Sequence, residues 1–348
     1  MKYISQREHG QSIVLITLLL IGLIAMLGLI LDGGNAYVKR RNMQNAADAA
    51  ALAGGRQLAL ANGAGDNSGA AEILVKNAIN NYTTANGGTT SSSNLYAFFV
   101  DQSNISKGRI GANGGIPDGT TGVSVTISTQ FPTYFLGVVN ISTGDVGAHT
   151  LVQTGAPSGE TNLFPVAVPT ATLTNMTPSA TQCRYDLVDN PECEIWGSSY
   201  GSGSSGWTCF HDPNCGSSDL VDYENGTKKS GTIEIGDWIN TKTGVDGGAG
   251  DLTAWLTPTL VFVPVFDDWL DVGGGKLQYR VASFAVFQIT GYYFSGSNNA
   301  GSCPGTNHCT CGTDNKIVCG KFQRFAQSGD FDITKKCKYS FCGFQMWQ

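Results

Sequence analysis

The chain has 348 residues, enough for two or three domains of about 100 to 200 residues each. Charged residues make up only 14% of the chain, against a usual share of about 25%, and glycine occupies 46 of the 348 positions, well above its usual share of about 7%. The low charge disfavours a helical bundle held by surface ion pairs. A hydrophobic share of 41% excludes wholesale disorder. The net charge of −6 leaves no basic surplus for a phosphate backbone, so we expect no nucleic-acid partner.

An uncharged apolar run extends from Ile13 to Leu31. A helix of about 20 residues spans the hydrocarbon core of a bilayer, so the run predicts a transmembrane segment over 13–31. A cleaved signal peptide usually has an apolar region of only about 7 to 15 residues. A cleaved signal and a buried core helix remain the alternatives to a retained anchor.

Basic residues flank the run on both sides, with Lys2 and Arg7 before it and Lys39, Arg40 and Arg41 after it, so charge does not set the orientation. All ten cysteines lie beyond residue 180, which favours an oxidising compartment for that part of the chain. We therefore expect a single-pass protein of the cell membrane, with a cytoplasmic N-terminus and an extracytoplasmic C-terminal body.

Residues 37–60 are rich in strong helix formers, so the helix is predicted to continue beyond the membrane. Its small residues recur at helical spacing, which suits either a stalk packed on its own domain or a seam against partner subunits. Asp48 is a solvated charge or a polar partner contact. The predicted interaction face consists of Gln44, Ala47, Asp48, Ala51 and Gly54.

A longer motif surrounds the span. Gly10-Gln11 precedes it, Asp32-Gly33-Gly34-Asn35-Ala36-Tyr37 follows, and then comes Gln44-Asn45-Ala46-Ala47-Asp48-Ala49-Ala50-Ala51-Leu52-Ala53-Gly54. This segment resembles the N-terminal motif of TadE/TadG-like proteins of Flp (tight adherence, type IVb) pilus assembly. Weaker similarity to the outer part of TadG-like proteins occurs at 231–244, 261–265 and 282–287. The resemblance implies a non-enzymatic, membrane-anchored structural component whose partners are other Tad or Flp pilus components.

Two departures qualify the resemblance. Pseudopilins cleaved by prepilin peptidase carry Glu at the fifth position after the cleaved Gly, whereas Leu15 stands there after Gly10, which favours a permanent anchor. Larger TadG relatives carry a D-x-S-x-S metal site, but the nearest string has Ile105 in place of the second Ser, so we assign no metal site.

The fold class expected is α+β. Residues 1–60 form the anchor and stalk helix, 61–155 an α+β unit with an antiparallel sheet, and 156–348 a disulfide-rich, mainly β unit. The patterns predict a helix over 70–80 and strands over 95–100, 123–128, 131–139 and 146–153. In the last unit they predict strands over 163–168, 259–266 and 279–290, with no regular period between 169 and 258.

The cysteines form a cluster of four and a cluster of six, so pairing within each cluster is possible. We expect disulfides, with a zinc site at His211 or His308, or free or mixed thiols, as the alternatives. Separately, the acidic residues 246, 251, 267, 268 and 271 are either calcium ligands or turn residues. No cofactor is predicted. The candidate disulfide cysteines are Cys183, Cys193, Cys209, Cys215, Cys303, Cys309, Cys311, Cys319, Cys337 and Cys342.

Residues 197–201 match G-x-S-x-G and residues 201–206 match G-x-G-x-x-G, but a loop rich in Gly and Ser lacks the strand and helix that both motifs need. The protein is therefore predicted not to be an enzyme. The alternative function is a stand-alone surface adhesin that binds glycan or another surface ligand through its Trp- and Tyr-bearing loops.

Overall fold

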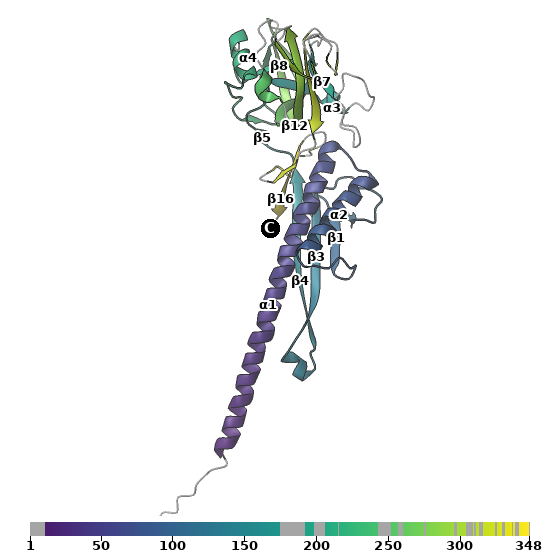
Figure 1. Cartoon of the computed structure of the whole chain (residues 1–348), viewed down its shortest axis with the longest axis vertical. Helices are drawn as coiled ribbons and strands as arrows, with labels where there is room; N and C mark the ends of the chain where they lie inside the picture. The colour runs from purple at the N-terminus through teal and green to yellow at the C-terminus, as the bar shows by residue number, and fades with distance from the viewer. Residues whose placement is uncertain are drawn as a thin grey trace, which may run out of the picture.

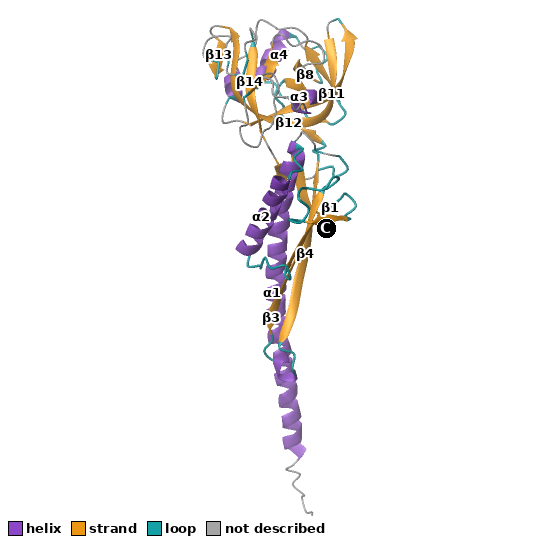
Figure 2. Ribbon diagram, turned by 90° about the vertical axis from the view of Figure 1, so that its right-hand side faces the viewer, coloured by secondary structure: helices purple, strands orange, loops and turns teal. Residues whose placement is uncertain are grey.

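The computed structural model has an elongated shape, with one long helix leading from the N-terminus into a body at the other end (Figure 1). It describes residues 11–174, 192–197, 206–214, 216–242, 252–256, 260–274, 276–295, 298–303, 309, 311–312, 316–323, 326–328, 331–335, 337 and 341–347. Two larger sheets make up the body, one beside the long helix and one beyond its end (Figure 2).

Helix α1 extends from Gln11 to Ala64 without interruption. It therefore joins the predicted transmembrane segment to the predicted stalk, and it passes through Gly33 and Gly34 as regular helix. Helix α2, Gly69–Ala85, follows after a short turn and packs beside α1. Ser68 caps α2 by accepting a hydrogen bond from the Ala71 N–H, as short hydroxyl side chains commonly do at helix starts.

The first sheet has six strands in the order β15-β16-β4-β3-β1-β2. Helix α1 packs on β3, β4 and β16 of this sheet, and the buried side chains of α1, α2 and these strands form one core. The strands are β1 (Leu95–Val100), β2 (Ser106–Arg109), β3 (Gly122–Pro132), β4 (Thr143–Gly155), β15 (Ala326–Ser328) and β16 (Cys342–Trp347).

The β3–β4 hairpin corrects one sequence prediction. Residues 131–139 were expected to form a strand, yet β3 ends at Pro132 and a 3-10 turn, η1, covers Leu136–Val139. Asn140 has a positive φ of 68°, a conformation that Asn tolerates well. The chain reverses here, so the apolar run that suggested a strand forms the tip of a hairpin.

A buried carboxylate fastens α2 to the loop after β2. The Glu72 side chain accepts backbone hydrogen bonds from Gly111 (2.7 Å), Asn113 (3.2 Å) and Gly115 (2.7 Å). Burial acts to raise the pKa of Glu72, but these hydrogen bonds outweigh it and the pKa lies below its usual value. The loop is thus held to the helix by a charged group away from solvent.

The second sheet has the order β10-β8-β6-β11-β12-β14-β7, with β13 beside β12. An additional pairing of β10 with β12 closes β6, β8, β10, β12 and β11 into a ring, which removes exposed strand edges there. The strands are β6 (Val166–Pro169), β7 (Cys193–Gly197), β8 (Gly206–Phe210), β10 (Trp238–Lys242), β11 (Leu260–Gly273), β12 (Lys276–Ser295), β13 (Asn298–Gly301) and β14 (Ile317–Gln323).

Short elements complete the body. They are β5 (Gly159–Glu160), which pairs with β9 (Ile233–Glu234), the helices α3 (Thr170–Thr174) and α4 (Ser217–Glu224), and the 3-10 turn η2 (Leu252–Trp255). Three core clusters of described residues pack on the second sheet. One includes Trp196 and Trp207, another Phe210 and Tyr279, and a smaller third one Ile317 and four cysteines.

The end of the chain returns to the first sheet, which the division at 155 and 156 did not anticipate. Strand β16 pairs antiparallel with β4 from Gly343↔Gly155 to Trp347↔Leu151. The Phe341 N–H also bonds the Phe284 carbonyl of β12 at 3.1 Å. Residues 326–347 therefore link the two sheets.

Candidate functional site: the membrane anchor and stalk helix

The apolar part of α1 is largely exposed in the described structure. Large side chains from Ile13 to Leu31 are about half to two thirds exposed, and the segment is long and apolar enough to cross a membrane. A helix buried in a protein core would have these side chains covered. The buried-core alternative is therefore wrong, and the helix fits a single-pass membrane anchor.

Beyond the span, the small residues of α1 let the first sheet approach closely. Ala46, Ala47, Ala50 and Ala51 are fully buried. A Cβ atom added at Gly54 would lie 2.6 Å from Ile79 Cγ1 of α2. The close packing is therefore with the chain's own sheet and helix, as in the first of the two alternatives for the stalk.

Most of the predicted interaction face lies on this packed side, while Gln44 is exposed. Ala47, Ala51 and Gly54 are buried. Gln44 Nε2 donates to Asp48 Oδ1 at 2.7 Å and to Thr150 Oγ1 at 3.2 Å, and the Thr150 hydroxyl donates to Asp48. The structure thus brings all five predicted residues together, and their described contacts are with β3, β4 and α2. Asp48 has a polar contact within the chain, which neither sequence alternative included.

Asp32 has a structural role that its local sequence does not signal. It is the first residue after the apolar run and is buried, with its carboxylate accepting backbone hydrogen bonds from Tyr134 (2.7 Å), Phe135 (3.1 Å) and Leu136 (2.8 Å). We call these three contacts the Asp32 clasp. They hold the hairpin tip against α1 more than 100 residues away in sequence, a partnership that sequence spacing does not reveal.

One turn further into the apolar run, Gly28 touches the same tip. A Cβ atom at Gly28 would lie 2.4 Å from Phe135 Cβ, so only glycine allows this approach. The hairpin tip therefore overlaps the last turn of the predicted transmembrane segment.

Comparison with known families matches residues 10–57 to the model described as "Putative Flp pilus-assembly TadE/G-like". Residues 10–57 are therefore similar to the TadE/G-like family, and we call them the TadE/G-like segment. They comprise the exposed span, the Asp32 position and most of the packed stalk. No curated protein and no solved structure gave a significant match to the chain.

The body beyond the TadE/G-like segment contains disulfides, as predicted. The pairs Cys303–Cys309, Cys311–Cys319 and Cys337–Cys342 all lie within the second sequence cluster, and Cys193 and Cys209 are disulfide-bonded as well. Cys183 and Cys215 lie outside the described residues. Sulfurs of Cys303, Cys309 and Cys319 come close enough to hold a metal, but their disulfide bonds leave no thiolate to bind one.

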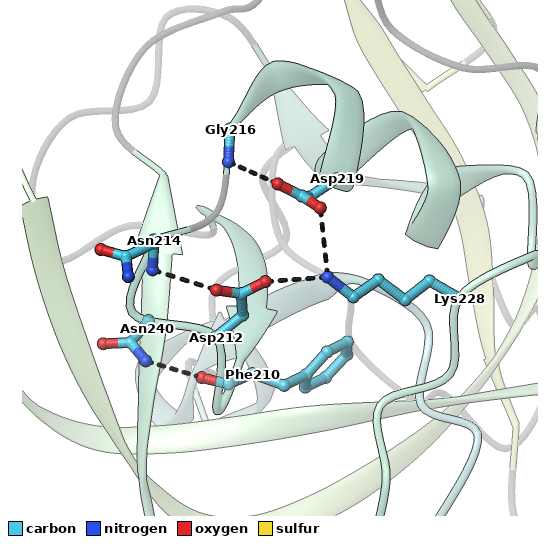
Figure 3. A network of polar contacts seen from close by, with 7 residues as sticks. All are labelled: Phe210, Asp212, Asn214, Gly216, Asp219, Lys228 and Asn240. Atoms are coloured by element: carbon cyan, nitrogen blue, oxygen red, sulfur yellow. Dashed lines mark hydrogen bonds and ion pairs between the residues drawn. The ribbon is translucent and has the colours of Figure 1, made fainter.

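An ion-pair network organises the segment after β8 (Figure 3). Lys228 Nζ donates to Asp212 at 2.8 Å and to Asp219 at 3.2 Å, and these hydrogen bonds, that to Asp212 above all, raise the pKa of Lys228. The backbone N–H groups of Asn214 and Gly216 donate to the same two carboxylates. The network links the start of α4 to the strand end at Phe210.

The other charged candidates also have partners within the protein. Asp267 and Asp268 lie beside Arg280, at 3.0 and 4.0 Å, and Asp271 accepts the Gly273 N–H. These three acids thus contact Arg280 and a turn. Residues 246 and 251 of the calcium alternative lie outside the described part of the chain.

Histidines do not assemble a catalytic set within the described ranges. His149 bonds Ser124 at 2.9 Å, and His211 lies 3.6 Å from Asp237. Neither is joined there to a nucleophile, a base and an orienting acid together. The zinc alternative at His308, and the two glycine motifs over 197–206, fall mainly on residues outside those ranges.

Proposed function

We propose that the protein is a membrane-anchored structural component of Flp (tight adherence) pilus assembly. The observation that carries this proposal is the TadE/G-like match over 10–57 on a helix whose apolar side chains are exposed. The same helix continues into the core of the first sheet. A rigid connection of this kind suits a protein that holds an extracytoplasmic body at the membrane.

The proposed orientation puts the N-terminus in the cytoplasm and the body outside it. Support comes from the disulfides, since these bonds persist in oxidising compartments. Protease added to spheroplasts should digest the body and leave an N-terminal fragment containing the span. A body that resists digestion until the membrane is opened would reverse the orientation.

Partner recovery tests the role in assembly. We expect other Tad or Flp components to co-purify with the full-length protein after mild crosslinking in its native membrane. In a matched sample, an unrelated single-pass helix replaces residues 11–31. Components that co-purify only with the native protein are those whose binding depends on the span. Recovery of no pilus component from either sample would refute the proposal.

A stand-alone adhesin is the second candidate. The observation in its favour is a set of exposed apolar side chains on β10 and the β11–β12 hairpin of the second sheet, namely Trp238, Trp269, Leu270 and Val272. Exposed aromatic residues of this kind often mark binding surfaces. Glycan binding that is lost in Trp269→Ala and kept in Tyr82→Ala, without any pilus partner, would favour this candidate.

A further inference from the structure

The tip of the β3–β4 hairpin, residues 133–142, has an unusual surface. Tyr134 is 67% exposed and Ile141 51%, and Phe135 and Leu136 are partly exposed beside them. No charged residue occurs between 131 and 144. An uncharged tip with clustered large apolar side chains is costly to leave in water.

The position of this tip along α1 indicates what covers it. The Asp32 clasp holds it at the end of the apolar run, and Phe135 contacts Gly28 one turn deeper. One helical turn corresponds to about 5.4 Å along the axis. If the run up to Leu31 lies in hydrocarbon, then the tip reaches the same depth as the last turn of the span.

The backbone of the tip is suited to this depth. A polar backbone group near the hydrocarbon needs a partner within the protein. Asp32 accepts the N–H groups of 134–136, while the N–H groups of Thr133, Asn140 and Ile141 donate to carbonyls within the tip at 3.0 to 3.1 Å. The Thr133 hydroxyl donates to the Ile141 carbonyl. The tip therefore satisfies much of its own hydrogen bonding without water.

We propose that residues 133–142 form a second membrane contact, inserted into the interfacial layer of the leaflet from which α1 emerges toward the body. The occupant is the phospholipid of that leaflet. Tyr134 would lie at headgroup level, where Tyr and Trp are enriched in membrane proteins, and Tyr37, which is also exposed, lies on α1 just beyond Asp32. The proposal rests on α1 being the membrane anchor.

Photocrosslinking of the full-length protein in proteoliposomes of phosphatidylcholine and phosphatidylglycerol tests this contact. A benzophenone amino acid replaces Tyr134 or, in a second variant, Ile141. Leu20 in the span is the positive control, and Tyr82 on α2, 53% exposed, is the matched control. Retention of the disulfides identifies folded protein.

We expect lipid adducts, detected by mass spectrometry, from the probes at 20, 134 and 141 and none from the probe at 82. Lipid adducts at 20 with none at 134 and 141 would overturn the inference and leave the anchor intact. Protein adducts in place of lipid at both tip sites would overturn it in favour of a contact between copies of the chain. Absence of lipid adducts at 20 would instead refute the anchor, and with it the proposed function.

Discussion

Three carboxylates of α1 and α2 each hold a segment that is distant in sequence. Asp32 binds the hairpin tip, Asp48 binds Thr150 of β4, and Glu72 binds the loop after β2. Hydrogen bonds to ionised groups are stronger than neutral ones. In a chain with few charges, these three acids therefore join helices to the sheet and its loops. They do not serve only as solvated surface charges.

Glu72→Gln should destabilise the body by about 2 kcal/mol, because a neutral amide replaces an ionised acceptor of several N–H groups. The lowered folded-state pKa means that ionisation of Glu72 favours the folded state. Its contribution is full above the unfolded pKa, near the usual 4.5, and is lost as pH falls through the lowered folded value. Thermal unfolding midpoints of both proteins in detergent, measured as pH falls, check this.

Asp145→Asn is the matched control, since Asp145 is an exposed acid of β4. Its midpoint should differ little from that of the parent at every pH. A difference between Glu72→Gln and the parent that stayed constant down to the most acidic pH would contradict the assigned role of the charge.

Asp32→Ala should loosen the hairpin tip while leaving the body folded. Without the carboxylate, the N–H groups of Tyr134, Phe135 and Leu136 lose their acceptor. Hydrogen–deuterium exchange should become faster at these three amides and remain unchanged in β1, with Asp145→Asn again as the control. Unchanged exchange at the tip would mean that other contacts hold it.

At the level of elements, the sequence predicted several helices and strands correctly. The helix over the apolar run and the stalk, strand β1 and strand β3 are confirmed, and α2 was expected over part of its length. The strands β7, β8, β10 and β14 were not predicted. The first three have only five residues each, and β14, although seven residues long, does not alternate apolar with polar residues over its first half. The tip residues 133–139 were assigned to a strand because apolar content alone does not separate a strand from a turn segment.

Glycines on α1 differ in what surrounds them, which gives a controlled comparison. A Cβ atom at Gly55 would lie 2.3 Å from Val152 Cγ1, while Gly33 and Gly34 have nothing within 4 Å. Gly55→Ala should therefore destabilise by about 1 to 3 kcal/mol through overpacking, which outweighs the gain in helix propensity of about 1 kcal/mol. Unfolding midpoints of the two kinds of variant provide the test.

Gly33→Ala is the control and should be neutral or slightly stabilising, because it gains the propensity without a clash. Equal effects at Gly33 and Gly55 would show that helix propensity, and not the packing on β4, decides the stability of this region.

At the scale of the whole molecule, the last strand connects the two sheets. A chain that ends before Phe341, with Cys337→Ser to avoid a free thiol, should lose β16 and expose the edge of β4. Hydrogen–deuterium exchange should then rise at Leu151, Gln153 and Gly155. The full-length Cys337→Ser/Cys342→Ser double variant separates loss of the strand from loss of the disulfide, and it should keep these amides protected.

This pairing could not be predicted from the sequence. Strand partners far apart in the chain leave no local signal, and Cys342–Trp347 has the same apolar character as a strand of the second sheet would have. The TadE/G-like motif was recognisable because its residues lie close together in the sequence. The surface that packs against it comes from residues 123–155, which are far from it in the sequence.

The unbroken helix also has a mechanical consequence. At about 1.5 Å per residue, the 54 residues of α1 form a rod of roughly 80 Å, with no swivel between the bilayer and the body. Torque applied to the embedded end is therefore transmitted to the first sheet. A neighbouring helix that packs on one side of the span would therefore fix the rotation of the body about the axis of α1.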